Sequence, residues 1–449
     1  MIFPILAVLA AVEIVQSPRS IRRLLPALAA IAAMSVAMLW AFYGFRYAAR
    51  PGNQQIIPPT AVYLQNLKHP AEVAVIRFAE RRHLLPESYL YGLTDVAIIS
   101  QQGRPAYLFG KLYPNGRWFY FPAAFVIKST LGFLLLLLLA VAAKGIWQGK
   151  TLRETLFIAL PATIFFAAAI NSKLDTGLRH ILPVYPFLIV LAAAAAWSLA
   201  RQSKRWACAV AFLLMFHVGS SLKAYPNYLP YSNELFGGPL NTRKVLADSN
   251  VGWAGEMKAT EKYIEQHHVS QCWFAYDGPA IPAYYHIGCA PLPTLFSGLL
   301  RRPQQIVPQH IQGPLFIGSQ AMTGFDYGPA DLNPYQQFAA LHPSAVLQGE
   351  ILVFDGEFDV PRICGLSHFV AANALAAGGH MEEAVSEARS ATAVYPEFRP
   401  AHELLASLYA SEKQRDLPMG EYQIALNIYR TVQPEFQKLR DAPRNPLGQ

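Results

Sequence analysis

Six apolar segments occupy the first half of this chain and constrain its fold more than any other feature. They cover residues 2–16, 24–45, 119–143, 155–170, 181–200 and 206–222. A helix needs about 20 apolar residues to cross a bilayer core, with about 17 as a lower limit. The second, third and fifth segments meet that length, and the fourth and sixth reach it with flanking residues. Residues 2–16 lack the basic start and cleavage site of a signal peptide. We therefore predict a multi-pass α-helical membrane protein with about six spans within residues 1–222.

The composition supports this prediction. Hydrophobic residues make up 53% of the 449 residues and charged residues 15%, whereas soluble domains carry about 25% charged residues. The 37 Lys and Arg exceed the 29 Asp and Glu by eight. Basic residues of membrane proteins collect in short cytoplasmic loops. Because the chain is so apolar, we attribute its basic charge to a membrane protein and expect no nucleic-acid partner.

Three short basic connectors set the expected orientation. Residues 17–23, 144–153 and 201–205 each join two apolar segments and each carry three Lys or Arg. Such loops stay in the cytoplasm. We therefore expect the long loop 46–118, the connector 171–180 and everything after residue 222 to face outward. In a bacterium these parts would lie on the periplasmic side of the inner membrane.

Residues 223–362 have the composition of a folded soluble domain. A helical stretch and three strand-like runs predict a small periplasmic α/β domain; they lie at 256–267, 271–276, 314–318 and 345–354. Cys272 and Cys289 both fall in this domain, and they either form a disulfide or stay as two thiols. No His-x₃-His or His-Glu-x-x-His pair occurs in the chain, so we expect no tightly bound metal.

Residues 363–449 form a third region. Within it, residues 366–430 are rich in Ala and self-similar at an interval of 34: Ala372, Leu375 and Ala391 recur as Ala406, Tyr409 and Ala425. The interval, with Ala384 and Pro396 in the first copy, resembles a tetratricopeptide repeat. The second copy departs from the pattern, with Pro418 and Arg430 in those two positions. This helical pair would bind a periplasmic protein partner or would cap the α/β domain, and the sequence favours neither.

The connector 171–180 and the residues after it hold the densest group of polar side chains. Lys173, Asp175, Arg179 and His180 lie within eight residues of one another. The planar guanidinium of Arg binds phosphate through two hydrogen bonds, and His donates a hydrogen bond or moves a proton near neutral pH. The alternative is that the two cations only anchor helix ends among lipid headgroups.

Lys128 interrupts an apolar segment near its outer end. A charged side chain in hydrocarbon costs about 2.5–3.5 kcal/mol on insertion scales. Lys128 must therefore extend to the outer surface or meet an anion, and a lipid phosphate lies within its expected reach.

The run from Ser172 to Ala196 resembles the signature of the GT-C membrane glycosyltransferases, in particular the protein O-mannosyltransferase and aminoarabinose-transferase-like superfamily. Those proteins carry a basic residue and then Arg/Lys-[Tyr/His]-x-Leu-Pro-x-Tyr-Pro at an outward helix start. The corresponding residues here are Arg179, His180, Leu182, Pro183, Tyr185 and Pro186. The resemblance extends over about residues 1–362, through similar phrases at Glu87–Leu93, Phe109–Lys111, Tyr120–Gly132 and Tyr228–Glu234.

A further similar motif is Asp248-Ser249-Asn250. In a bacterial branch of the superfamily this motif continues as hydrophobic-Asp-Trp-Gly-Gln. Here it continues as Val251-Gly252-Trp253-Ala254-Gly255, so the Asp and the Gln are missing.

The resemblance implies transfer of a sugar, with inversion, from a polyprenyl-phosphate carrier to an acceptor outside the cytoplasm. This chemistry needs a carboxylate base for the acceptor hydroxyl and cations for the leaving phosphate. The implied donor-phosphate residues are Lys128, Lys173, Arg179 and His180, and we expect Lys128, Arg179 and His180 to converge on one phosphate.

The resemblance leaves the base unassigned. The family's catalytic Asp, or Asp-Glu pair, lies in a first outward loop that has no counterpart here, and family members usually have about twice as many spans. The chain is therefore expected to correspond to a C-terminal half, with a separate N-terminal half as a potential partner. Asp175, Glu87 and Asp95 remain as substitute bases, although a solvated or salt-bridged carboxylate is the commoner role for each. The alternative function is a non-catalytic membrane-anchored scaffold.

Overall fold

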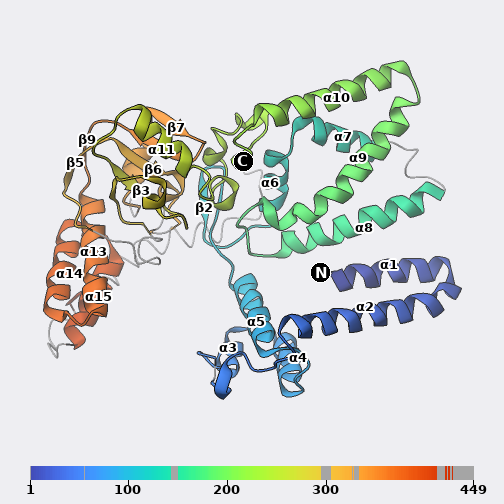
Figure 1. Ribbon diagram of the computed structural model, residues 1–449, viewed down its shortest axis with the longest axis horizontal. Helices are drawn as coiled ribbons and strands as arrows, with labels where there is room; N and C mark the ends of the chain where they lie inside the picture. Colours follow the sequence, from blue (N-terminus) through green and yellow to red (C-terminus); the bar gives the residue numbers. More distant parts are fainter. Residues whose placement is uncertain are drawn as a thin grey trace.

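The computed structural model describes residues 2–54, 56–142, 150–294, 305–325, 327, 333–411, 420–421, 423–424 and 427. This part of the chain is mostly helical, with one small sheet region (Figure 1). Apolar helices lie together on one side, and the sheet and the C-terminal helices lie on the other.

Every predicted apolar segment forms helix. The helices are α1 (Ile2–Gln16), α2 (Ile21–Phe42), α6 (Tyr120–Lys128), α7 (Leu131–Ala142), α8 (Lys150–Asn171), α9 (Tyr185–Ala200) and α10 (Lys204–Lys223). Among the described residues, four helical stretches are long and apolar enough to cross a membrane: Pro18–Phe42, Arg153–Asn171, Leu178–Ala200 and Lys204–Lys223. The α6–α7 pair makes a fifth if it is one broken span, and α1 is shorter, with 15 residues.

The segment 119–143 differs from the single straight helix that its composition predicts. Its two helices, α6 and α7, meet at an angle of 116°. Ser129 adopts an extended backbone conformation after α6, and the Thr130 hydroxyl accepts a hydrogen bond from Phe133 N at 3.2 Å, as an N-cap does for a new helix. Gly132 then allows α7 to approach α10 closely, because a Cβ there would lie 2.5 Å from Leu213 O.

The described parts of the basic connectors lie at one end of the helical bundle. The α1–α2 turn, the start of α8 and the α9–α10 turn share this end, and the sheet lies at the opposite end (Figure 1). Arg153 pairs there with Glu13, which joins α8 to α1. Lys144 of the second connector is outside the described residues. The separation of the connectors from the sheet is the arrangement that the charge pattern predicts.

The loop 46–118 is itself largely structured. It contains α3 (Thr60–Tyr63), α4 (Pro70–Arg81), α5 (Glu87–Gln102) and a hairpin of β1 (Ala106–Leu108) and β2 (Lys111–Tyr113). Leu108 of the hairpin also bridges to Leu246. The loop therefore contacts the residues that lead into the sheet domain.

The sheet domain is built on five strands in the order β4-β3-β6-β8-β7. These are β3 (Trp273–Ala275), β4 (Ala290–Pro291), β6 (Leu315–Gly318), β7 (Ala345–Leu347) and β8 (Ile351–Phe354), with α11 (Met257–Gln266) packed on one face. Strand β3 is parallel to β4 and β6, whereas β8 is antiparallel to β6 and β7. A small antiparallel pair, β5 (His310–Gln312) and β9 (Glu357–Asp359), lies beside this sheet.

Alternating side chains build two cores around the sheet. Phe274, Phe316 and Val353 face α11, and their neighbours Ala275, Leu315 and Leu352 enter a second core on the other face. The segment 345–354 is not one strand, as its composition suggests, but a tight β7–β8 hairpin. Gln348 and Gly349 make the turn with φ of 46° and 74°, a region that favours Gly.

Cys272 and Cys289 form a disulfide between the residues that precede β3 and β4. The structure thus selects one of the two alternatives that the sequence leaves open. Cys208 is exposed and Cys364 is buried, and both are free thiols.

The C-terminal region begins as a helical hairpin. Helices α13 (Pro361–Ala377), α14 (Met381–Val394) and α15 (Arg399–Ser411) pack through Ala372, Ala384 and Ala388, each with no exposed surface. The start of α13 enters the sheet core through Ile363. This contact accords with a capping role. Pro418, Ala425 and Arg430 of the second copy are outside the described residues.

The 34-residue interval is visible in the side-chain contacts. His368 Nδ1 lies 2.6 Å from Glu387 Oε2, and His402 Nδ1 lies 2.8 Å from Glu421 Oε2. Both members of the second pair lie 34 positions after those of the first. Among the described residues, this His–Glu contact therefore recurs at the interval seen in the sequence.

The disulfide is testable by counting thiols. We expect maleimide to label two of the four cysteines when the protein is denatured without reductant, and all four after reduction. The readout is the intact mass of the labelled chain. Four labels without reductant would contradict the disulfide.

The packing of the repeat is testable by enlarging Ala388. We expect Ala388→Leu to lower the free energy of unfolding by about 1–3 kcal/mol, because the added carbons have no space in a closed core. The same change at Ala393, which is exposed on the same helix, is the matched control. Thermal unfolding of the two variants checks the difference, and equal melting temperatures would refute this packing.

Candidate functional site

A turn at residues 248–252 joins the helical bundle to the sheet domain. Asn250 is 1% exposed, and its side chain accepts a hydrogen bond from Leu178 N at 3.0 Å and donates one to the Tyr120 hydroxyl at 2.8 Å. Beside it, the Ser249 hydroxyl donates to Thr176 O at 2.7 Å. The turn is therefore held by the first residue of α6 and by residues that precede α9.

Close approach of this turn requires Gly177. Its φ is 153°, and a Cβ at this position would overlap the Ser249 hydroxyl. The short 3₁₀ helix η5 (Leu178–Val184) starts directly afterwards and leads into α9. The polar sequence that precedes α9 thus packs against the turn 248–252.

Lys128 contacts the turn from the bundle side. Its Nζ donates to Asn250 O and to Leu229 O, both at 2.6 Å. Lys128 is the last residue of α6, immediately before the break between α6 and α7. The cation that interrupts the apolar segment is thus held by backbone carbonyls at the end of a helix.

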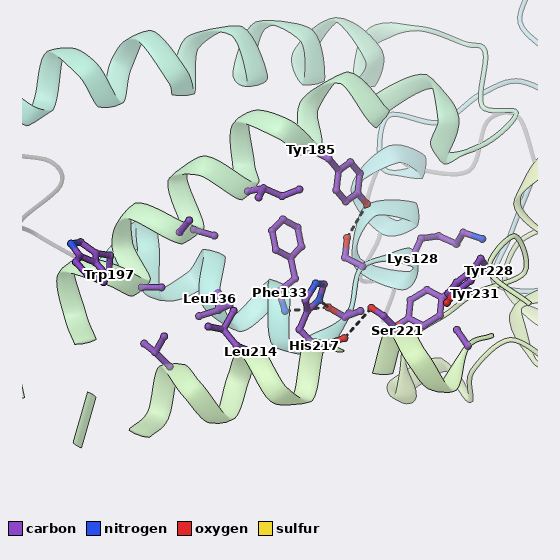
Figure 2. Close-up of a pocket in the computed structure, with 18 of the residues that line it drawn as sticks. Lys128, Phe133, Leu136, Tyr185, Trp197, Leu214, His217, Ser221, Tyr228 and Tyr231 are labelled. Atoms are coloured by element: carbon purple, nitrogen blue, oxygen red, sulfur yellow. Dashed lines mark hydrogen bonds between the residues drawn. The ribbon is translucent and has the colours of Figure 1, made fainter. Parts of the chain in front are cut away.

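An apolar cavity of about 580 Å³ opens between α7, α9 and α10 (Figure 2). Lys128, Tyr228 and Tyr231 lie at one end, and Trp197 lies toward the other. Most of its wall is aliphatic and aromatic, from residues such as Phe133 and Leu136. This volume is in the range of ligand sites in proteins.

The polar groups of this cavity are paired across the helices. Ser129 Oγ and the Tyr185 hydroxyl are 2.9 Å apart, and Thr130 Oγ1 and His217 Nδ1 are 2.6 Å apart (Figure 2). These bonds join the break between α6 and α7 to α9 and α10. They satisfy the polar groups that the broken helix brings into an apolar setting.

A second, polar cavity of about 440 Å³ lies on the other side of the turn, between the bundle and the sheet domain. Its charged lining residues are Arg104, Arg179, Asp248, Glu256, Asp277 and Glu350. The guanidinium of Arg179 lies 5.1 Å from the ring centre of Trp253, a cation–π contact that orients it. Two cations and several carboxylates thus face one space.

Burial raises the pKa of three of these carboxyl groups. Asp248 has a pKa above its ordinary value because it is desolvated, although its own neighbours Arg179 and Arg104 oppose the shift. Burial also raises the pKa of Glu256. Burial, together with the charges of Glu256 and Asp277, raises the pKa of Glu350 to about 8.

The four predicted donor-phosphate residues do not form one cluster. Lys128 lines the apolar cavity, and Arg179 lines the polar one. His180 Nε2 is 2.8 Å from Thr176 Oγ1, and neither cavity lining includes His180 or Lys173. Adjacency in the sequence misleads here because Arg179 and His180 are consecutive residues of the 3₁₀ helix η5, in which neighbouring side chains point about 120° apart.

Lys173 contributes through its backbone. Its carbonyl accepts a hydrogen bond from Arg104 N at 3.1 Å. A Cβ on Gly103 would approach the Lys173 side chain to 3.0 Å. Lys173 therefore positions the segment that carries Arg104 into the polar cavity.

Asp175 is buried, with 2% of its surface exposed. One carboxylate oxygen accepts a hydrogen bond from Arg117 N at 2.5 Å, and the other has no hydrogen-bond partner within the described residues. Burial raises the pKa of this carboxyl to about 7. Asp175 does not line the polar cavity, whose wall includes its neighbour Thr176.

Glu87 and Asp95 form hydrogen bonds within the loop 46–118. Glu87 accepts a hydrogen bond from Ala49 N at 2.8 Å, and Asp95 accepts one from the Tyr63 hydroxyl. Neither is part of the polar cavity lining. Both carboxylates therefore have local structural partners.

Five charged residues of the polar cavity were not among the sequence candidates: Arg104, Asp248, Glu256, Asp277 and Glu350. The motif Asp248-Ser249-Asn250 is the one sequence signal for this region. Arg104 and Glu350 carry no local signal, because each reaches the cavity only through the packing of distant elements.

Within the described ranges, no group of three or more His, Cys, Asp and Glu residues could hold a metal ion. No protein family model, curated protein or solved structure matches this chain.

The role of the turn is testable at Asn250. We expect Asn250→Ala to lower the free energy of unfolding by about 1–3 kcal/mol, because Leu178 N and the Tyr120 hydroxyl lose their partner in a buried position. Thermal unfolding in detergent is the measurement, with the exposed Asn66→Ala as the control. A wild-type melting temperature for Asn250→Ala would contradict this account.

Proposed function

We propose that this chain transfers a sugar from a polyprenyl-phosphate carrier to an acceptor on the outer face of a bacterial inner membrane, alone or with a separate N-terminal half. The observation that carries the proposal is the pair of cavities on the two sides of the turn 248–252. One suits a lipid chain, and the other suits a charged, hydroxyl-bearing headgroup.

The exposed apolar helices support a membrane location. Helix α2 has 22 residues and none of them is buried in the chain. A helix that is hydrophobic around its exposed surface needs a lipid or protein cover. The basic end of the bundle would then lie in the cytoplasm, and the polar cavity would lie outside.

The donor would be divided between the two cavities. An isoprenoid chain would occupy the apolar cavity between α7, α9 and α10, where it replaces lipid tails at little cost. Its phosphate would lie at the turn, where Arg104 and Arg179 neutralise the charge that develops when the bond to the sugar breaks. Lys128 would act by holding the turn in place.

Asp248 is the best-placed general base. It lines the polar cavity with the two arginines, whereas Asp175, Glu87 and Asp95 do not. Its φ of 57° lies in a region that non-Gly residues rarely occupy but that Asp tolerates, and such backbone strain is common at functional sites. In the reaction, Asp248 would accept the proton of the acceptor hydroxyl while the hydroxyl oxygen bonds to the sugar carbon and the phosphate leaves.

A scaffold function is the second candidate. It is favoured by the helical repeats, whose His–Glu contacts recur at 34 residues. Such repeats often bind protein segments, so residues 366–430 would recruit a periplasmic partner. A scaffold function alone, however, gives no role to the polar cavity with its arginines and carboxylates.

Sugar transfer is tested with membranes that contain the full chain and with polyprenyl phosphates that each carry one radiolabelled sugar. We expect at least one donor to lose its label faster than in membranes without the chain. Asp248→Asn should slow this loss by about 10²-fold or more, and Arg179→Ala by about 10²-fold.

The control is Arg201→Ala, which should leave the rate unchanged. Arg201 directly follows α9, and the α9–α10 turn lies at the end of the bundle opposite the sheet (Figure 1). Equal loss of every label with and without the chain would overturn the proposal. Equal rates for the wild type and Asp248→Asn would remove Asp248 as the base.

A further inference from the structure

In the wall of the polar cavity, a side chain from the β7–β8 hairpin fills the space beside a glycine of the turn 248–252. Gly252 ends the turn, and a Cβ at this position would lie 2.8 Å from Glu350 Cγ and 2.9 Å from Glu350 Cδ. Both residues line the polar cavity. Glu350, from the β7–β8 hairpin, thus occupies the space that a side chain at position 252 would fill.

Glu350 is held firmly in this space. Its Oε2 accepts a hydrogen bond from the Ser319 hydroxyl at 2.5 Å, and its backbone carbonyl accepts one from Ser319 N at 2.9 Å. Only 6% of the residue is exposed. The tight turn at Gln348 and Gly349 directs this residue inward, so the hairpin geometry fixes the carboxyl.

Burial and two neighbouring carboxylates, Glu256 before α11 and Asp277 after β3, favour the neutral form of Glu350. The hydrogen bond from Ser319 and the charge of Arg243 oppose them. Burial is the largest influence, and the pKa is about 8. Near pH 7 Glu350 is therefore mainly a carboxylic acid, which has one O–H to donate.

We propose that Glu350 binds a hydroxyl oxygen of the transferred sugar by donating a hydrogen bond from its carboxyl O–H. The sheet domain would thus supply the polar side chain that position 252 lacks. This inference rests on the proposed function. A carboxyl from the β7–β8 hairpin thus stands in the space that a side chain at position 252 would fill. Trp253 and Tyr276 add aromatic surface to the same cavity.

Glu350 is a binding residue here and not a second base. A general base must be ionised before it accepts a proton, and the surroundings of Glu350 disfavour ionisation. Burial raises the pKa of Asp248 as well, but Arg104 and Arg179 face this carboxyl and oppose the shift, whereas Glu350 has carboxylates that add to it. The two carboxyls of one cavity thus have separate roles.

The test uses Glu350→Gln, Glu350→Ala and the double variant Glu350→Ala/Gly252→Asp, with the donor that the wild type consumes. Glu350→Ala should raise the donor KM about tenfold, the factor expected for one buried hydrogen bond, with a smaller effect on kcat. Gln still donates a hydrogen bond, so Glu350→Gln should keep a KM near that of the wild type at pH 7. Gly252→Asp should restore much of the lost affinity in the double variant.

The pH dependence separates this role from a purely structural one. The wild-type KM should rise as the pH passes about 8, because Glu350 loses its proton, and Glu350→Gln should lack this rise. A second readout is stability. Since the folded-state pKa lies above the ordinary 4.5, Glu350 favours folding at low pH, and this contribution is lost as the pH rises toward 8.

The difference in melting temperature between Glu350→Gln and the wild type should therefore grow in favour of Glu350→Gln from pH 5 to pH 8. Glu382→Gln, on the exposed start of α14, is the matched control and should show no such trend. A wild-type KM for Glu350→Ala, or loss of transfer in Glu350→Gln at pH 7, would overturn the inference while the proposed function stands. No transfer by the wild type would instead overturn the proposed function.

Discussion

The side chain of Asn250 is the contact on which the arrangement of the other parts depends. It receives a hydrogen bond from the backbone before α9 and gives one to Tyr120 at the start of α6. The backbone carbonyl of the same residue accepts a hydrogen bond from the ammonium of Lys128 at the end of α6. An amide suits this position because it donates and accepts at once. One residue of a sheet-domain turn therefore fixes two helices of the bundle.

The turn that carries this contact lies between two chemically different cavities, one within the bundle and one between the bundle and the sheet domain. On one side, the broken α6–α7 helix opens an apolar space in which Ser129 pairs with Tyr185 and Thr130 with His217. On the other side, arginines from the bundle connectors face carboxylates from the sheet domain. A lipid-linked sugar has the same two parts, an apolar chain and a polar headgroup, and that correspondence is the physical basis of the proposed transfer.

The sequence predicts the helices well and the site only in part. Long apolar runs and basic connectors identify every bundle helix, because hydrophobicity is a local property. The break at Ser129 and Thr130 is not evident from composition. Thr130 can cap a new helix there, but the broken form is favoured over a continuous helix only when α7 packs against α10. The cations near Arg179 are recognisable as a group, but their side-chain directions depend on Gly177 and the turn 248–252. Arg104 and Glu350 join the cavity through tertiary packing alone, so no local pattern could have identified them.

The most direct test of the account is a structure of the full chain in lipid nanodiscs with a polyprenyl-phosphonate sugar, which keeps the sugar bonded to its carrier. The account predicts the isoprenoid chain between α7, α9 and α10, the phosphonate within hydrogen-bond distance of Arg104 or Arg179, and the sugar in the polar cavity. A headgroup bound at the basic end of the bundle, or outside both cavities, would contradict it.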